Sequence, residues 1–253
     1  MTAPYSPAEL MAVLIARNLR DGEVVVMGAV PALPLAACRL AKATHAPGLW
    51  YIVGGSGTVN PRPANLPASS CDPALAPADC VLPLPEIVLL EGRGDALDVF
   101  CAGGLQIDAY GNCNLIAVGD WARPALRGPG TVGLPFLPVT RRSIIYTATH
   151  TPRTFVERVD FVSGPGHAAG AEQERSYRKL GPAQVVTPLA TLNFDPVTRR
   201  MRLASMHPGV SDDAVRAATG FELTPGPAPL TPPPTAEELA ALRSVDPDGA
   251  LRG

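Results

Sequence analysis

Residues 24–57 read VVVMGAVPALPLAACRLAKATHAPGLWYIVGGSG, and this stretch decides the fold class. The apolar runs Val24–Met27 and Leu49–Val53 have the length and composition of short buried strands. Between them, residues 32–42 carry the apolar spacing of a helix. Strand, helix and strand in this order form a βαβ unit, whose two strands run parallel. The sequence therefore predicts an α/β fold with an open, largely parallel sheet flanked by helices.

Glycines follow three of the predicted strands. Gly28 follows the first strand, and the second leads into Gly54, Gly55, Ser56 and Gly57. A third apolar strand, residues 97–102, leads into Gly103 and Gly104. Ligands of open α/β sheets gather at the carboxyl ends of the strands. We therefore expect these three turns to line one substrate site.

Residues 103–114, GGLQIDAYGNCN, form the most distinctive of the three turns. Adjacent glycines allow close approach of a ligand to the backbone, whose N–H groups can bind a carbonyl oxygen as it gains charge. An ordinary strand–turn–strand connection is the alternative. Gln106 and Asp108 alternate along a strand and so share one face. They either bind substrate or tie down the neighbouring loop.

The rest of the chain divides into a main domain and a C-terminal appendage. Residues 1–224 are predicted to form one α/β domain, which begins with a helix over 7–19 and includes a hairpin formed by the strands 191–194 and 201–205. Residues 225–234 contain six prolines and are predicted to be an extended linker. A final helix over 236–243, capped by Thr235, begins the tail 235–253.

The composition of the 253-residue chain limits its class. It is 46% hydrophobic, and its net charge of −2 disfavours a nucleic-acid partner or a basic membrane surface. No apolar run reaches the roughly 20 residues of a membrane span, and the N-terminus does not resemble a signal peptide. The five cysteines form no C-x-x-C pair and indicate reduced thiols, three or four of them buried. We expect a cytoplasmic protein without a metal site.

Several ordered segments resemble the B (β) subunits of the family I CoA-transferases, of the glutaconate type. Residues 103–114 resemble the family pattern G-[GA]-x-Q-x-D-x-x-G-N-x-N. The resemblance continues in LAKATHAP (40–47), FVERVDF (155–161), SMHPGV (205–210) and TGF (219–221). It implies a fold of the NagB/RpiA/CoA-transferase type. It also implies an obligate A (α) subunit as partner, in an AB or (AB)₂ assembly, and an acyl-CoA substrate that brings coenzyme A itself, with no bound cofactor.

The family's mechanism uses a glutamate in a Glu-Ser-Gly or Glu-Asn-Gly turn after the second strand, which attacks the thioester. Ser56-Gly57 align with the Ser-Gly of that turn, so the glutamate position falls on Gly55. No carboxylate lies between Glu23 and Asp72. The catalytic residue on this chain is therefore unknown, and the substrate-binding residues are predicted to be Gly28, Gly54, Gly55, Ser56, Gly103, Gly104, Gln106 and Asp108.

Three functions are compatible with the replacement. The resemblance extends to ring-opening hydrolases of cyclic β-keto acyl-CoA thioesters in steroid degradation, whose glutamate comes from the A subunit. Hydrolysis or ring opening is therefore favoured. CoA transfer to a carboxylic acid would require a displaced carboxylate such as Glu86 or Asp72. A non-catalytic partner of the A subunit is the third interpretation.

Overall fold

The computed structural model describes residues 5–167, 181–226 and 228–252. The chain forms two compact units, one comprising residues 1–101 and 233–253 and the other residues 102–232. The predicted main domain, 1–224, thus contains parts of both units.

The first unit contains the predicted βαβ motif. Strand β1 (Val24–Met27) is followed by helix α2 (Ala32–Thr44) and strand β2 (Trp50–Val53). β1 pairs in parallel with β2 and, on its other side, with β5 (Val99–Ala102). The short strands β3 (Thr58–Val59) and β4 (Cys80–Val81) then extend the sheet beyond β2 in antiparallel fashion. The predicted α/β fold is confirmed, with parallel strands β2, β1 and β5 at the centre of this part of the sheet.

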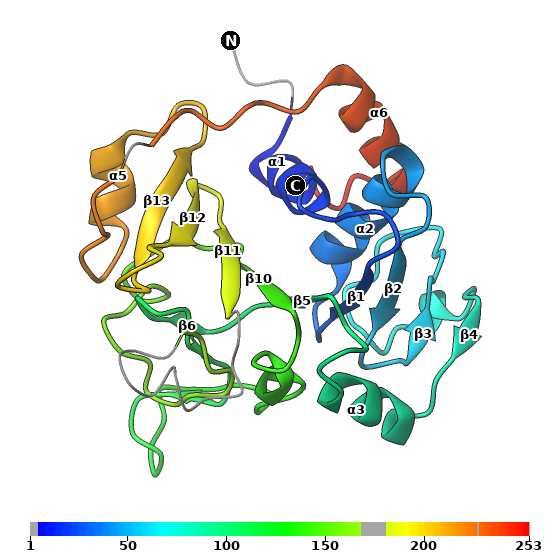
Figure 1. Ribbon diagram of the computed structural model, residues 1–253, viewed down its shortest axis with the longest axis horizontal. Helices are drawn as coiled ribbons and strands as arrows, with labels where there is room; N and C mark the ends of the chain where they lie inside the picture. The colour runs from blue at the N-terminus through cyan, green and yellow to red at the C-terminus, as the bar shows by residue number, and fades with distance from the viewer. Residues whose placement is uncertain (1–4, 168–180, 227, 253) are drawn as a thin grey trace. The chain divides into compact units, whose positions relative to one another are not determined.

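The described residues of the first unit form four α-helices. Helices α1 (Pro7–Ala16), α2 and α6 (Ala236–Val245) pack against one another, whereas α3 (Leu84–Gly92) lies apart from them, between β4 and β5 in the chain (Figure 1). The predicted helix over 7–19 is confirmed as α1, which ends earlier, at Ala16. Ser6 caps it with a capping box that includes Glu9, and Pro7 occupies its first turn. A short 3-10 helix covers Pro73–Leu75.

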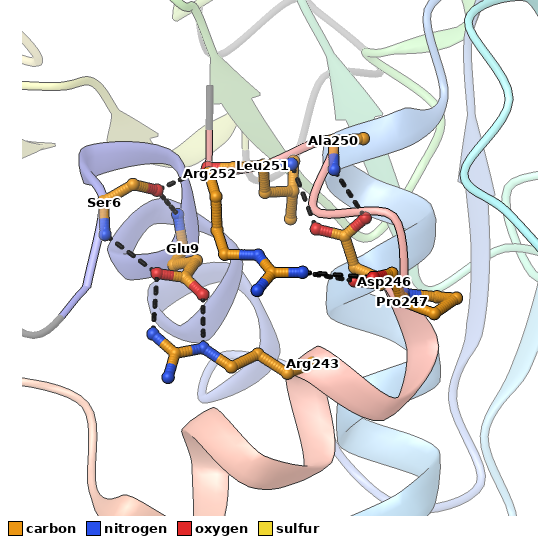
Figure 2. Close-up of polar contacts among 8 residues, drawn as sticks. All are labelled: Ser6, Glu9, Arg243, Asp246, Pro247, Ala250, Leu251 and Arg252. Carbon is orange, nitrogen blue, oxygen red and sulfur yellow. Dashed lines mark hydrogen bonds and ion pairs between the residues drawn. The ribbon is translucent and has the colours of Figure 1, made fainter.

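The C-terminal helix is part of this helical layer. The buried Glu9 carboxylate of α1 accepts hydrogen bonds from Arg243 Nε of α6 at 2.8 Å and from Ser6 N at 2.8 Å (Figure 2). Ser6 Oγ also donates to the carbonyl of Leu251. Asp246 accepts the backbone N–H groups of Ala250 at 2.8 Å and Leu251 at 3.0 Å, which closes the turn after α6. Residues 235–252 therefore complete the core of the first unit.

The second unit has its own strands. β10 (Arg142–Tyr146) and β11 (Pro182–Val186) pair in parallel. β11 then pairs antiparallel with β12 (Ala190–Phe194), and β12 with β13 (Met201–Met206). The predicted hairpin is confirmed. Among the residues that the structure describes in this unit, the small strands are β6 (Gln106–Ile107), β7 (Cys113–Asn114), β8 (Ala117–Val118) and β9 (Leu126–Arg127), and the helical segments are Leu134–Phe136 (3-10) and α5 (Asp212–Ala217).

The proline-rich segment, which comes after α5 in the chain, pairs with the end of strand β13. Leu230 forms a parallel bridge with Met206. Met206 N donates to Pro229 O at 3.0 Å, and Thr231 N donates to Met206 O at 2.7 Å. The segment predicted as a linker is thus anchored to the sheet of the second unit by backbone hydrogen bonds.

Three of the five cysteines, Cys38, Cys101 and Cys113, are buried and all five are free, as the sequence predicts. Among the described residues, no helix is long and apolar enough to cross a membrane.

Candidate functional site

The predicted site residues fall into two groups, one in each unit. Gly28, Gly54, Gly55 and Ser56 belong to the first unit, and Gly103, Gly104, Gln106 and Asp108 belong to the second.

In the first unit, the parallel register of β1 and β2 brings two predicted turns together. Met27 is the register partner of Val53, so Gly28 and Gly54 follow adjacent strand ends. Gly54 N donates to Met27 O at 3.0 Å. Within the described part of the chain, the N–H groups of Gly55 and Ser56 donate no hydrogen bond. Two backbone donors are therefore available at this turn.

Ser56 is engaged within its own turn. Its Oγ lies 2.8 Å from Thr58 Oγ1 and 3.4 Å from Val53 O. Neither neighbour is a base, so the turn does not activate Ser56 as a nucleophile.

The space beside Gly55 is filled by another residue. A Cβ added at Gly55 would overlap Ser70 Oγ and lie 2.7 Å from Ser70 Cβ. Ser70 is 5% exposed, and its backbone N–H donates to Ala29 O at 3.0 Å, in the loop after β1. The position at which the resemblance places the family's glutamate therefore holds no side chain, and Ser70 occupies the place of its Cβ although Gly55 itself is exposed.

A buried carboxyl group lies against the same turn. Glu91, in the last turn of α3, is 6% exposed, and its Oε1 lies 3.4 Å from the place of a Cβ at Gly54. Burial raises the pKa of Glu91 to about 7. This residue was not predicted from the sequence, where Glu86 and Asp72 are the candidate carboxylates. Glu86 is exposed, and Asp72 accepts the Ala74 N–H at 2.9 Å as a helix cap.

In the second unit, the Gly103–Gly104 turn leaves no room for a side chain at its second position. A Cβ at Gly104 would lie 3.0 Å from Gln106 O and 3.1 Å from Asn114 O. In the ranges that the structure describes, neither glycine N–H donates a hydrogen bond. The turn therefore offers two further free donors, as the oxyanion interpretation requires.

The side chain of Gln106 ties loops together. Its Nε2 donates to Asp160 Oδ2 at 3.0 Å, and its Oε1 accepts from Asn114 Nδ2 at 2.7 Å and from Asp160 N at 3.0 Å. Asp160 Oδ2 also accepts the Gly119 N–H at 2.8 Å. The contacts of Gln106 are therefore those of a residue that holds neighbouring loops together, which is one of the two interpretations given above.

Asp108 has a similar role. Its carboxylate accepts from Tyr110 N at 3.0 Å, Asn112 N at 3.1 Å and Asn112 Nδ2 at 2.8 Å. Burial raises the pKa of Asp108, and these hydrogen bonds partly offset that rise. The side chain closes the Tyr110–Asn112 turn rather than leaving an open acceptor. No cluster of three potential metal ligands occurs among the residues placed by the structure.

Comparison with known proteins shows which family has this architecture. Residues 8–218 match the family model described as Coenzyme A transferase. The chain belongs to the coenzyme A transferase family. It is 32% identical to the B subunit of 3-oxoadipate CoA-transferase from Pseudomonas knackmussii, over 96% of this chain and 94% of that protein.

Two further relatives of this coenzyme A transferase family chain have solved structures. It is 33% identical to the B subunit of glutaconate CoA-transferase from Acidaminococcus fermentans, over 98% of this chain and 95% of that protein. The crystal structure of that enzyme matches with a TM-score of 0.88, 32% identity and coverage of 99% and 98% of the two chains.

The third relative is the cholesterol ring-cleaving hydrolase IpdB subunit of Rhodococcus jostii, 31% identical over 97% of this chain and 94% of that protein. The IpdAB structure of that organism matches with a TM-score of 0.79, 28% identity and coverage of 99% and 98%. The chain thus belongs to a family of enzymes, and its relatives include both CoA-transferases and a hydrolase.

Proposed function

We propose that this chain is the B subunit of a heteromeric enzyme that adds water to acyl-CoA thioesters, and that its preferred reaction opens the ring of a cyclic β-keto acyl-CoA. The ring-cleaving IpdB subunit among its relatives supports the reaction class. Coenzyme A enters as part of the substrate.

One observation carries the proposal. CoA transfer in this family needs a carboxylate that forms a thioester, and the resemblance places it at Gly55. Glycine has no such group, and Ser70 covers the space in which one would lie. Without an enzyme nucleophile, water becomes the attacking group, provided that a base removes its proton.

The reaction itself suits the turns of this fold. Water adds to the ring ketone, the bond to the α-carbon breaks, and the electron pair is delocalised into the thioester as an enolate, which then takes up a proton. Negative charge therefore develops on carbonyl oxygens. Free backbone N–H groups, such as those of Gly103 and Gly104, stabilise charge of this kind.

An A subunit is the partner that the relatives' names indicate, since each is a B subunit or part of a two-subunit enzyme. Exposed apolar side chains on β4 and α3 offer a surface for it. Val81 is 59% exposed, Leu84 67% and Leu89 69%. Large apolar side chains that are this exposed favour contact with another chain. We assign this surface to the contact with the A subunit.

CoA transfer is the second candidate, because the two relatives that are 32% and 33% identical are CoA-transferase subunits. It requires a carboxylate elsewhere on this chain or on the partner.

The product of one reaction separates the candidates. The chain is purified together with a homologous A subunit and incubated in H₂¹⁸O with 2-oxocyclohexane-1-carboxyl-CoA and acetate. Ring opening yields pimeloyl-CoA with one ¹⁸O atom in its free carboxylate, and this is the expected product. Acetyl-CoA would instead demonstrate transfer. The same chain without the A subunit is the control and is expected to be inactive.

A further inference from the structure

Helix α3 departs in part from the pattern of an ordinary surface helix, since it buries Ile87 and exposes Glu86 but also buries Glu91. Leu84, Val88 and Leu89 are exposed, whereas the charged residue Glu91 is 6% exposed. Surface helices normally bury their apolar residues and leave carboxylates in water. The sequence places a charged group inward at a position where the fold would be served by an apolar one.

The Glu91 side chain lies at the strand ends rather than in the core. The nearest atoms to the place of a Cβ at Gly54 are Met27 O at 3.3 Å, Glu91 Oε1 at 3.4 Å and Val26 Cγ2 at 3.8 Å. The carboxyl oxygen therefore lies beside the turn in which the resemblance places the family's catalytic carboxylate.

Glu91 has no stabilising partner to account for its burial. Across the described segments of the chain, its side chain makes no hydrogen bond and no ion pair. Its place in the last turn of α3 is also unfavourable, because the carbonyl end of a helix repels negative charge. A buried carboxyl without partners costs stability, and such groups occur at functional sites.

No neighbouring charged group in the described part of the chain shifts the pKa of Glu91, so burial is the cause of its shift. Residues 24–27 of β1 and 54–57 of the turn contain no titratable side chain. On and after α3, Glu86 is exposed, and Arg93 pairs with Asp95 at 3.2 Å in solvent. With desolvation as the cause, the pKa of Glu91 is about 7.

We propose that Glu91 is the general base of this chain, acting on the water that attacks the substrate carbonyl beside the Gly54–Gly55 turn. This inference rests on the proposed hydrolytic function. It places the base on this chain, at the end of α3, and not on the A subunit, from which the resemblance to the ring-opening hydrolases implies that the glutamate comes. There Glu91 removes a proton instead of forming a thioester.

The step balances without a further reactant. The water oxygen bonds to the ring carbonyl carbon, and one proton of the water moves to Glu91. The bond between that carbon and the α-carbon then breaks, and the electron pair leaves with the α-carbon. Glu91 returns its proton to this carbon. The sum is substrate plus water to the ring-opened acid, with Glu91 unchanged.

The test compares variants of the complete complex with the A subunit on 2-oxocyclohexane-1-carboxyl-CoA in the presence of acetate, over pH 5 to 9. In the native complex, kcat/KM should rise with pH through about 7. Glu91→Gln should lower kcat/KM by about 100-fold or more and remove that rise, because a general base contributes about 10² to 10⁴. Glu91→Asp should recover part of the rate, with the pH dependence retained. Asp95→Asn, which alters an exposed carboxylate nearby, should match the native complex.

A stability measurement excludes a structural role. At pH 8, the Tm of the Glu91→Gln complex should equal or exceed that of the native complex, since the variant no longer buries a charge. A Glu91→Gln complex with a lowered Tm, or with kcat/KM within tenfold of the native value and an unchanged pH profile, would overturn the inference.

The reaction products distinguish a failure of the proposed hydrolytic function from a failure of the role of Glu91. If the native complex transfers CoA to acetate and Glu91→Gln does so equally well, both fail. If the native complex hydrolyses and Glu91→Gln does so equally well, only the role of Glu91 fails.

Discussion

Ser70 Oγ fills the space that a side chain on Gly55 would occupy, and Ser70 Cβ lies 2.7 Å from the place of its Cβ. Ser70 is held there by the hydrogen bond of its N–H to Ala29 O at 3.0 Å. The Ser70 side chain can thus occupy its place only because residue 55 has no side chain. Introducing a glutamate at residue 55, where the resemblance places the family's carboxylate, consequently requires a change at both positions.

We expect Gly55→Glu alone to destabilise the first unit without producing CoA transfer. Overpacking of this kind costs about 1–3 kcal/mol. Gly55→Glu combined with Ser70→Gly should recover most of this loss and give transfer of CoA to acetate. Ser70→Gly alone is the control. Urea unfolding and acetyl-CoA formation provide the two measurements. A Gly55→Glu variant as stable as the native chain would show that Ser70 moves aside at no cost in stability.

Gly28 permits a clean test of substrate contact. A Cβ there meets no atom within 4 Å, and its φ is not positive, so Gly28→Val should leave the free energy of unfolding within about 0.5 kcal/mol of the native value. If Gly28 lines the substrate site, the added side chain displaces substrate and kcat/KM falls on the order of 100-fold. Gly22→Val, at a φ of 76°, should instead reduce stability and leave turnover unchanged. Full activity of Gly28→Val would remove this residue from the site.

Gln106→Ala should act on the stability of the second unit. It deletes the hydrogen bonds to Asp160 and Asn114 and leaves buried polar groups with fewer partners, which costs about 1–3 kcal/mol. The urea midpoint of the complex reports this loss. Well below the midpoint, turnover should fall less than tenfold. A variant with native stability and a larger loss of turnover would identify Gln106 as a substrate contact.

The Glu9–Arg243 pair should control unfolding in acid. Burial raises the pKa of Glu9, but Arg243 and the Ser6 N–H outweigh it, so the folded-state pKa lies below the usual 4.5. The stabilisation is therefore present above pH 4.5 and is lost as the pH falls through the folded-state value. Arg243→Met should move the acid unfolding midpoint to higher pH. Arg93→Met, in a solvent-exposed pair, should leave it unchanged.

Leu89→Lys should weaken assembly with the A subunit. Leu89 is 69% exposed on α3, and a charge placed there would be buried in the proposed contact. The variant should fold as the native chain does and elute without the A subunit in size-exclusion chromatography. Val197→Lys is the matched control, because Val197 is 86% exposed in the β12–β13 loop. Complex formation by Leu89→Lys at native affinity would place the interface elsewhere.

Local patterns in the chain were sufficient for the parallel unit of β1, α2 and β2, because strand and helix periodicities are visible in consecutive residues. The capping of α1 by Ser6 and of α6 by Thr235 also follows from local chemistry. The attachment of Pro229 and Leu230 to Met206 does not, because a proline-rich segment carries no signal for the strand edge that it joins.

The sequence by itself determined that residue 55 is a glycine and that no carboxylate lies between Glu23 and Asp72. It also determined the family, through ordered motifs such as residues 103–114. Only the tertiary structure decided that Ser70 fills the place of a Cβ at Gly55 and that Glu91 lies beside the turn at Gly54, 37 residues earlier in the sequence. The reason is physical: a carboxyl group's neighbours and burial, and hence its pKa, depend on chain segments brought together by folding.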